Sequence, residues 1–122
     1  MLNDDDDDEY FNPFEKELRE YLDAYNEYLT HEEKLKSPTV SKHISLLSHM
    51  IGFACGYHSV YGFEDFTLTI IGSKMLQSFN HHNTESYPLD RSYRIIYRFF
   101  DFIYSRYGIA NHELLAKLRK RI

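Results

Sequence analysis

Three arginines in the second half of the chain have the chemistry and the spacing to bind an anionic ligand. Arg91, Arg94 and Arg98 are spaced i, i+3 and i+7, so they share one face of a helix. Guanidinium groups donate paired hydrogen bonds to phosphate oxygens and to guanine edges. An ordinary solvated helix face, partly paired with Asp90 and Asp101, is the competing interpretation of the same residues.

A second candidate group lies at the start of an earlier helix and combines hydroxyl side chains with a lysine. Hydroxyls and free backbone amides at a helix N-terminus suit phosphate oxygens, although simple helix capping explains the same residue types. Taken together, the candidate binding residues are Thr39, Ser41, Lys42, Ser45, Arg91, Arg94 and Arg98.

No catalytic or metal-binding motif accompanies these residues. His81 and His82, with His112 or His58, match no metal-site spacing, so a polar surface linker is predicted there and no metal site. A Gly-rich phosphate loop, a nucleophile elbow and a CxxC pair are all missing, so we expect neither enzymatic activity nor a cofactor. The single cysteine, Cys55, lies in an apolar segment and is predicted to be a buried thiol in a reducing cytosol.

Charge is divided unevenly along the 122 residues. Residues 1–33 carry thirteen acidic and two basic side chains, a net charge of −11, whereas residues 34–122 carry six acidic and twelve basic ones, a net charge of +6. A basic body can face a polyanion even though the whole chain carries −5. Six consecutive acidic residues, Asp4 to Glu9, predict a disordered acidic tail over residues 1–12, followed by one folded domain over 13–122.

The apolar residues recur with helical periodicity and predict an all-α bundle of four main helices plus a short C-terminal fifth helix. The predicted helices cover residues 13–35, 39–55, 67–80 with Thr67 or Thr69 as the cap, 88–107 with Gly108 as the C-cap, and a last helix that Asn111 caps. A strand at Phe66–Ile71 is the alternative there, because that segment is rich in β-branched and aromatic residues. No run of about 18 apolar residues exists, so we expect no membrane span and a cytoplasmic location.

Two segments of the chain are similar to each other, about 50 residues apart. Each begins with a helix-start signal, and their apolar residues occupy matching offsets: Val40, Ile44, Leu47 and Met50 in the first and Leu89, Tyr93, Ile96 and Phe99 in the second. The doubled pattern starts at Ser37-Pro38-Thr39, continues through Arg91 and ends in Gly108-Ile109-Ala110-Asn111. It resembles the N-terminal, SAM-like core-binding domain of tyrosine recombinases, the phage integrases, over about residues 14–121.

The resemblance implies a DNA-facing surface and a bacterial mobile element as the setting. In that family the second and fourth helices lie toward duplex DNA, which here implies Thr39, Ser41, Lys42 and Ser45 on one helix and Arg91, Arg94 and Arg98 on the other. The chain departs from the family pattern at Pro88, at His112 and in the acidic tail, and it ends where the catalytic domain would begin. No strand-exchange chemistry is therefore expected.

Double-stranded DNA is the partner that these residues favour. We expect the acidic tail to compete with DNA for the basic face, so removal of the tail should tighten DNA binding. The alternative is a helical adaptor or dimerisation domain that docks on a recombinase or on itself without binding DNA. Exposure of Tyr57, Tyr61, Phe63 and Phe66 would favour that alternative. A DNA mimic is the third hypothesis and relies on the acidic N-terminal third, against which the basic body argues.

Overall fold

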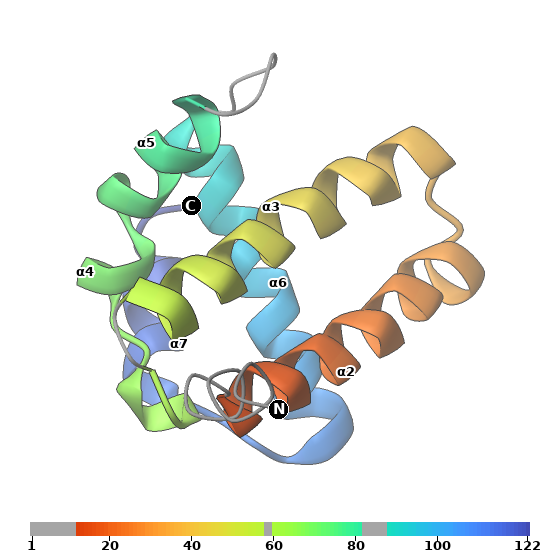
Figure 1. Ribbon diagram of the computed structural model, residues 1–122. Coiled ribbons are helices and arrows are strands. Elements are labelled where there is room, and N and C mark those ends of the chain that lie inside the picture. Colours follow the sequence, from red (N-terminus) through yellow and green to blue (C-terminus); the bar gives the residue numbers. More distant parts are fainter. Residues whose placement is uncertain (1–11, 58–59, 82–87) are drawn as a thin grey trace, which may run out of the picture.

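The structure is a computed structural model that describes residues 12–57, 60–81 and 88–122, apart from the side chain of Tyr57. The predicted acidic tail lies outside the described residues except for Asn12, as does most of the polar linker that follows His81. All regular elements within the described ranges are helical, which confirms the all-α class (Figure 1). They are α2 (Pro13–Glu27), η1 (Tyr28–Glu32), α3 (Ser37–Tyr57), η2 (Phe63–Asp65), α4 (Leu68–Ile71), α5 (Ser73–His81), α6 (Leu89–Tyr107) and α7 (His112–Arg119).

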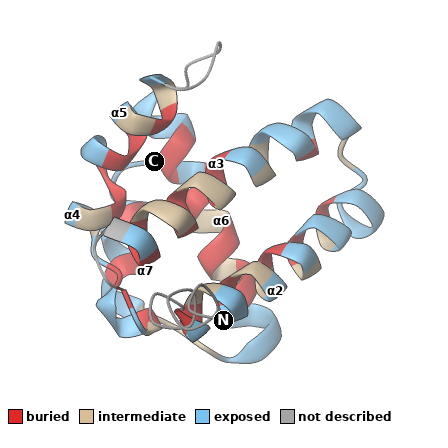
Figure 2. Cartoon of the chain, in the orientation of Figure 1, coloured by how far each residue is buried: buried red, intermediate tan, exposed pale blue. Residues whose placement is uncertain are grey.

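The core is built around α6, which crosses behind α3 in Figure 1 and contacts α2, α3, α5 and α7. Its buried face contains Tyr93, Ile96, Phe99, Phe100 and Ile103, which confirms the predicted apolar stripe from Tyr93 onward, whereas Leu89 at its start is exposed. The stripe faces the other helices, and the buried positions gather where they cross (Figure 2). Burial of one continuous stripe therefore turns the opposite face of α6, with its arginines, toward solvent.

The first predicted helix is confirmed as an α-helix as far as Glu27, and the structure differs from the prediction in the turns that follow. The α-helix ends at Glu27 and continues as one π-helical turn, in which the Glu33 amide donates to the Tyr28 carbonyl at 3.0 Å. Lys34 then adopts a left-handed conformation with φ of 55°, which reverses the chain before α3. The wider turn places Glu33 where it reaches α6, a contact that the sequence does not predict.

The second predicted helix begins two residues early, at Ser37 rather than Thr39. Pro38 is compatible with this start, because the first turn of a helix leaves its backbone N–H groups without intrahelical partners. The first intrahelical bond is donated by the Val40 amide to the Lys36 carbonyl at 3.0 Å. As a result, Thr39 lies inside the first turn of α3.

The third predicted helix is divided into α4 and α5 at Gly72. Thr67, one of the two predicted caps, accepts a hydrogen bond from the Ile70 amide, and the segment around it forms no strand. Gly72 has a backbone conformation of φ −90° and ψ −136°, which is not helical. The break turns α5 so that Met75, Leu76 and Phe79 enter the core.

Two asparagines connect the segment between α3 and α4 to two other helices. Asn12 is the N-cap of α2, and Asn111 is the N-cap of α7. Asn12 caps α2 and its amide donates to the Val60 carbonyl at 2.9 Å, so this residue belongs to the folded domain rather than to the tail. Asn111 is the predicted cap of α7, and its amide donates to the carbonyls of Phe63 and Phe66 at 2.9 and 3.0 Å. Gly108 has the left-handed conformation predicted for the C-cap of α6, with φ of 73°.

None of the described helices is both long enough and apolar enough to cross a membrane.

Candidate functional site

A groove of about 330 Å³ lies between the N-terminal halves of α3 and α6. Five of the seven candidate residues line it together with two others: Thr39, Lys42, His43, Arg91, Arg94, Ile95 and Arg98. The two helices that carry these residues are those that the sequence analysis singles out. The structure thus brings the arginine ridge and the start of α3 to one place.

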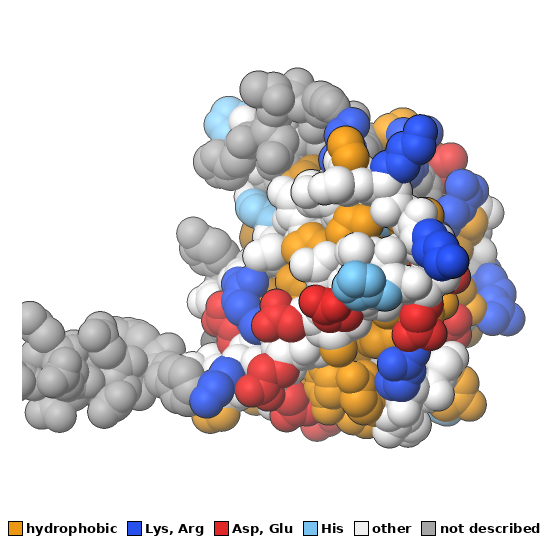
Figure 3. Space-filling model, turned by 90° about the vertical axis from the view of Figure 1, so that its right-hand side faces the viewer, with side chains coloured by type: hydrophobic (Ala, Val, Ile, Leu, Met, Phe, Trp, Pro, Cys, Tyr) orange, Lys and Arg blue, Asp and Glu red, His pale blue; other side chains and the backbone are white. Residues whose placement is uncertain are grey.

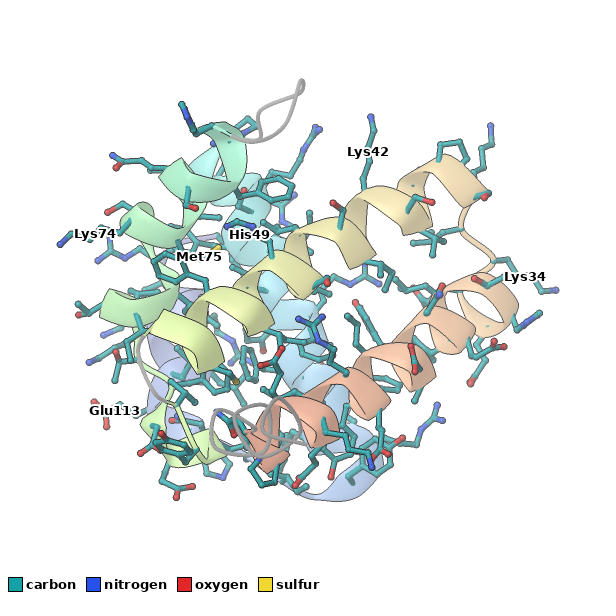
Figure 4. All side chains as sticks on the ribbon, viewed as in Figure 1. Lys34, Lys42, His49, Lys74, Met75 and Glu113 are labelled. Atoms are coloured by element: carbon teal, nitrogen blue, oxygen red, sulfur yellow. The ribbon has the colours of Figure 1, made fainter. Side chains whose placement is uncertain are left out.

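Helical periodicity on α6 and α3 explains which side chains meet in the groove. Arg91, Arg94 and Arg98 lie on the face of α6 opposite its buried stripe. On α3, Thr39 and Lys42 are three residues apart and therefore share a face. Lys42 extends from α3 on the side away from α2 (Figure 4).

Ser41 and Ser45 lie on the other side of α3, away from the arginines. They line a separate hollow between α2 and α3, with Asn26, Val40, Ile44 and Ser48. Residues two positions apart on an α-helix point in nearly opposite directions, because each residue advances the helix by about 100°. A ligand seated against the arginines therefore contacts Thr39 and Lys42 but neither of the two serines.

The ion pairs around the groove distinguish Arg98 from the other two arginines. The Arg98 guanidinium donates to the Glu33 carboxylate at 2.8 Å, and the Tyr28 hydroxyl donates to the same carboxylate at 3.2 Å. Arg98 therefore connects α6 to the turn between α2 and α3. Arg91 and Arg94 are exposed and form no ion pair with any residue that the structure describes, Asp90 and Asp101 included.

The charge at the groove is predominantly positive. Four cationic side chains line it, and one of them, Arg98, is paired with the carboxylate of Glu33. On the face shown in Figure 3, several blue side chains lie along the right-hand edge, while red and blue ones are mixed across the lower half. Closely spaced cations, of which Arg91 and Arg94 form no ion pair with a described carboxylate, favour the binding of an anion.

His43 is the groove residue that the sequence analysis missed. Its ring is half-buried, and its Nδ1 atom is buried without a hydrogen-bond partner among the described residues. Burial, and secondly the neighbouring Arg98 charge, lower the pKa of His43 from its ordinary 6.5, so the imidazole is neutral at pH 7. The signal available in the sequence was its position four residues after Thr39, which places it on the same face of α3.

We expect the lowered pKa of His43 to make the protein less stable in mild acid. The folded-state pKa lies below the unfolded-state value, so the unfolded chain binds more protons as the pH falls through about 6.5. Stability is therefore full above that pH and decreases below it. Urea unfolding at about pH 7 and pH 5.5 checks this, and His43→Gln should lose less stability between the two conditions than wild type. The same pH dependence in both proteins would contradict the assignment.

Other candidate sites are not assembled among the described residues. No group of three or more His, Cys, Asp or Glu side chains there could hold a metal ion, while His58 and His82 lie outside these ranges. Cys55 is buried as predicted, and burial raises the pKa of its thiol to about 11, which keeps it protonated at neutral pH.

The aromatic patch proposed for a protein partner does not form from the described residues. Phe63 and Phe66 are buried in the core, where their rings contact Phe14 and Phe100. Tyr61 is 66% exposed, and the side chain of Tyr57 lies outside the described part of the chain. One exposed tyrosine is ordinary for a protein surface and does not indicate a docking face.

Comparison of the chain with known proteins found no matching family model, no matching curated protein and no matching solved structure. The resemblance to the core-binding domain of tyrosine recombinases is therefore an expectation from the sequence.

Proposed function

We propose that the chain is a non-catalytic module that binds double-stranded DNA through the groove between α3 and α6. The observation that carries the proposal is the convergence of Lys42, Arg91 and Arg94 on one hollow. Contacts from lysine and arginine to phosphates supply most of the sequence-independent affinity of proteins for DNA. Arg91 and Arg94 form no ion pair with the described residues, so they can donate to phosphate without first breaking one there.

The proposal includes a SAM-like arrangement of the helices, related to the core-binding domain of tyrosine recombinases. Its support is the order of the helices, the position of the arginine ridge, and the exit from α6 through Gly108 to the capped start of α7. In that arrangement α3 and α6 correspond to the second and fourth helices, which face the duplex in the family. The groove lies between these two helices.

Salt dependence of DNA binding tests the proposal. If all four cations of the groove contact phosphates, the affinity for a labelled 20-base-pair duplex should fall on the order of 100-fold between about 50 and 200 mM salt. Fluorescence anisotropy of the full-length protein measures this directly. Absence of binding at the lower salt concentration, both by the full-length protein and by the protein without its acidic tail, would reject the DNA-binding module and favour the adaptor alternative.

The effect of the acidic tail on DNA binding is measured separately with a shortened protein, because the tail can mask the groove. Asn12 is buried and caps α2, so the deletion should stop before it and remove residues 1–9. Tighter DNA binding by the shortened protein at low salt is expected if the tail competes with DNA for the cations. Equal affinity of the two proteins would exclude a competing role for the tail.

A further inference from the structure

The shape of the groove suits a ligand that enters it, whereas a duplex backbone alone would rest on its rim. Its volume of about 330 Å³ lies at the lower end of the range of roughly 300–1,000 Å³ that is typical of small-molecule sites. A duplex presents a convex outer surface, so its phosphates can reach the cations of the rim and leave the interior unfilled. Phosphate contacts by themselves therefore leave the hollow without an occupant.

The lining of the groove matches the chemistry of a nucleobase. Besides the cations, the groove is lined by the buried apolar residue Ile95 and by the half-buried ring of His43. Unpaired bases stack on aromatic rings, histidine among them, and on the planes of arginine guanidinium groups. The neighbouring arginines of α6 supply such planes at the same place where they can hold a phosphate.

The buried Nδ1 atom of His43 is a second, independent observation at this site. It has no hydrogen-bond partner among the described residues. A buried polar atom without a partner costs free energy, and in native structures such atoms need a specific explanation. The Nδ1 edge of the ring is therefore buried in the protein, while His43 also lines the groove beside the cations.

We propose that the groove seats one unpaired nucleotide of a DNA duplex, with its base against His43 and Ile95 and its phosphate between Lys42 and the arginines of α6. This inference rests on the proposed DNA-binding function and specifies its ligand. The preferred substrate is a duplex with an unpaired or displaced nucleotide. The remaining phosphates of the duplex contact the rim of the groove.

The test compares three labelled duplexes that share one sequence: fully paired, with one extra unpaired thymidine nucleotide, and with an abasic residue at the same bulge. We expect the thymidine bulge to bind about 10-fold more tightly than the paired duplex, within the range expected for stacking of one base. The abasic bulge bends the duplex but offers no base, so it should bind like the paired duplex. Equal binding of the thymidine and abasic bulges would overturn the proposal.

Variants of His43 separate the nucleotide seat from general DNA binding. His43→Gln removes the ring and should abolish the preference, so that the thymidine bulge binds this variant no more tightly than the paired duplex does. His43→Phe keeps an aromatic face and should retain the preference. A preference that persists in His43→Gln would overturn the role of the ring, and His112→Ala is a control on an exposed histidine of α7.

If none of the duplexes binds, the proposed function itself fails, which is a different outcome from equal binding of all three.

Discussion

Replacing Arg91 and Arg94 together with alanine is expected to reduce duplex affinity on the order of 100-fold at about 50 mM salt. Each arginine that contacts a phosphate releases about one counterion, so the slope of log affinity against log salt should also decrease by about two. Both side chains are exposed, and the protein should remain folded with a change in stability within about 0.5 kcal/mol. Anisotropy titrations over a salt series, with circular dichroism for the fold, measure both effects.

A matched variant separates this effect from a general loss of positive charge. Lys16→Ala with Lys74→Ala removes the same two charges from exposed positions on α2 and α5. Lys74 lies at the outer edge of α5, away from Lys42 (Figure 4). We expect this control to weaken binding less than about 3-fold, because screening limits the reach of distant surface charges. Similar losses in the two double variants would show that the groove is not the contact surface.

Gly72→Ala is expected to cause the largest loss of stability of any glycine substitution in the chain. A Cβ atom at this position would overlap the carbonyl oxygen of Leu68, which is backbone and cannot rotate away. It would also approach the Tyr93 hydroxyl oxygen to 3.4 Å. Relief of the overlap requires a shift of α4 relative to α5, so we expect a loss of about 3 kcal/mol in the free energy of unfolding.

Gly56→Ala provides the control for this substitution. Gly56 lies in α3, and a Cβ atom there would meet no other atom within 4 Å. Alanine lowers the entropy of the unfolded chain and favours helix, so a gain of about 0.5–1 kcal/mol is expected. Urea unfolding of both variants checks the pair. Comparable stability of Gly72→Ala and wild type would show that the α4–α5 junction adapts to a side chain.

The position of Gly72 illustrates why the sequence predicts one helix where the structure has two. The apolar periodicity from Leu68 to Phe79 fits a single continuous helix, and an isolated glycine is compatible with such a pattern. The break arises from packing, because α5 must turn to bury Met75 and Leu76 in a core formed by distant segments. The spacing of apolar residues from Leu68 to Phe79 does not specify the direction in which α5 turns relative to α4.

The same distinction applies to the turn after α2. The sequence predicts a helix as far as Leu35 because the first break signal is Lys36-Ser37-Pro38, but the π-helical turn and the left-handed Lys34 end the α-helix earlier. Glu33 then pairs with Arg98, which is 65 residues away in the chain. An ion pair of that separation depends on the relative placement of two helices, which single-sequence periodicity does not provide.

The sequence by itself determined the features that depend on neighbours within a few residues. These are the helical class, the caps at Gly108 and Asn111, and the shared face of the three arginines on α6. Only the tertiary structure decided which face of α3 meets that ridge. The packing of the helices places Thr39, Lys42 and His43 beside the arginines and places Ser41 and Ser45 on the side of α3 that faces α2. The physical reason is that helix formation is set by local hydrogen bonds and periodicity, whereas the rotation of one helix against another is set by long-range burial of side chains in the common core.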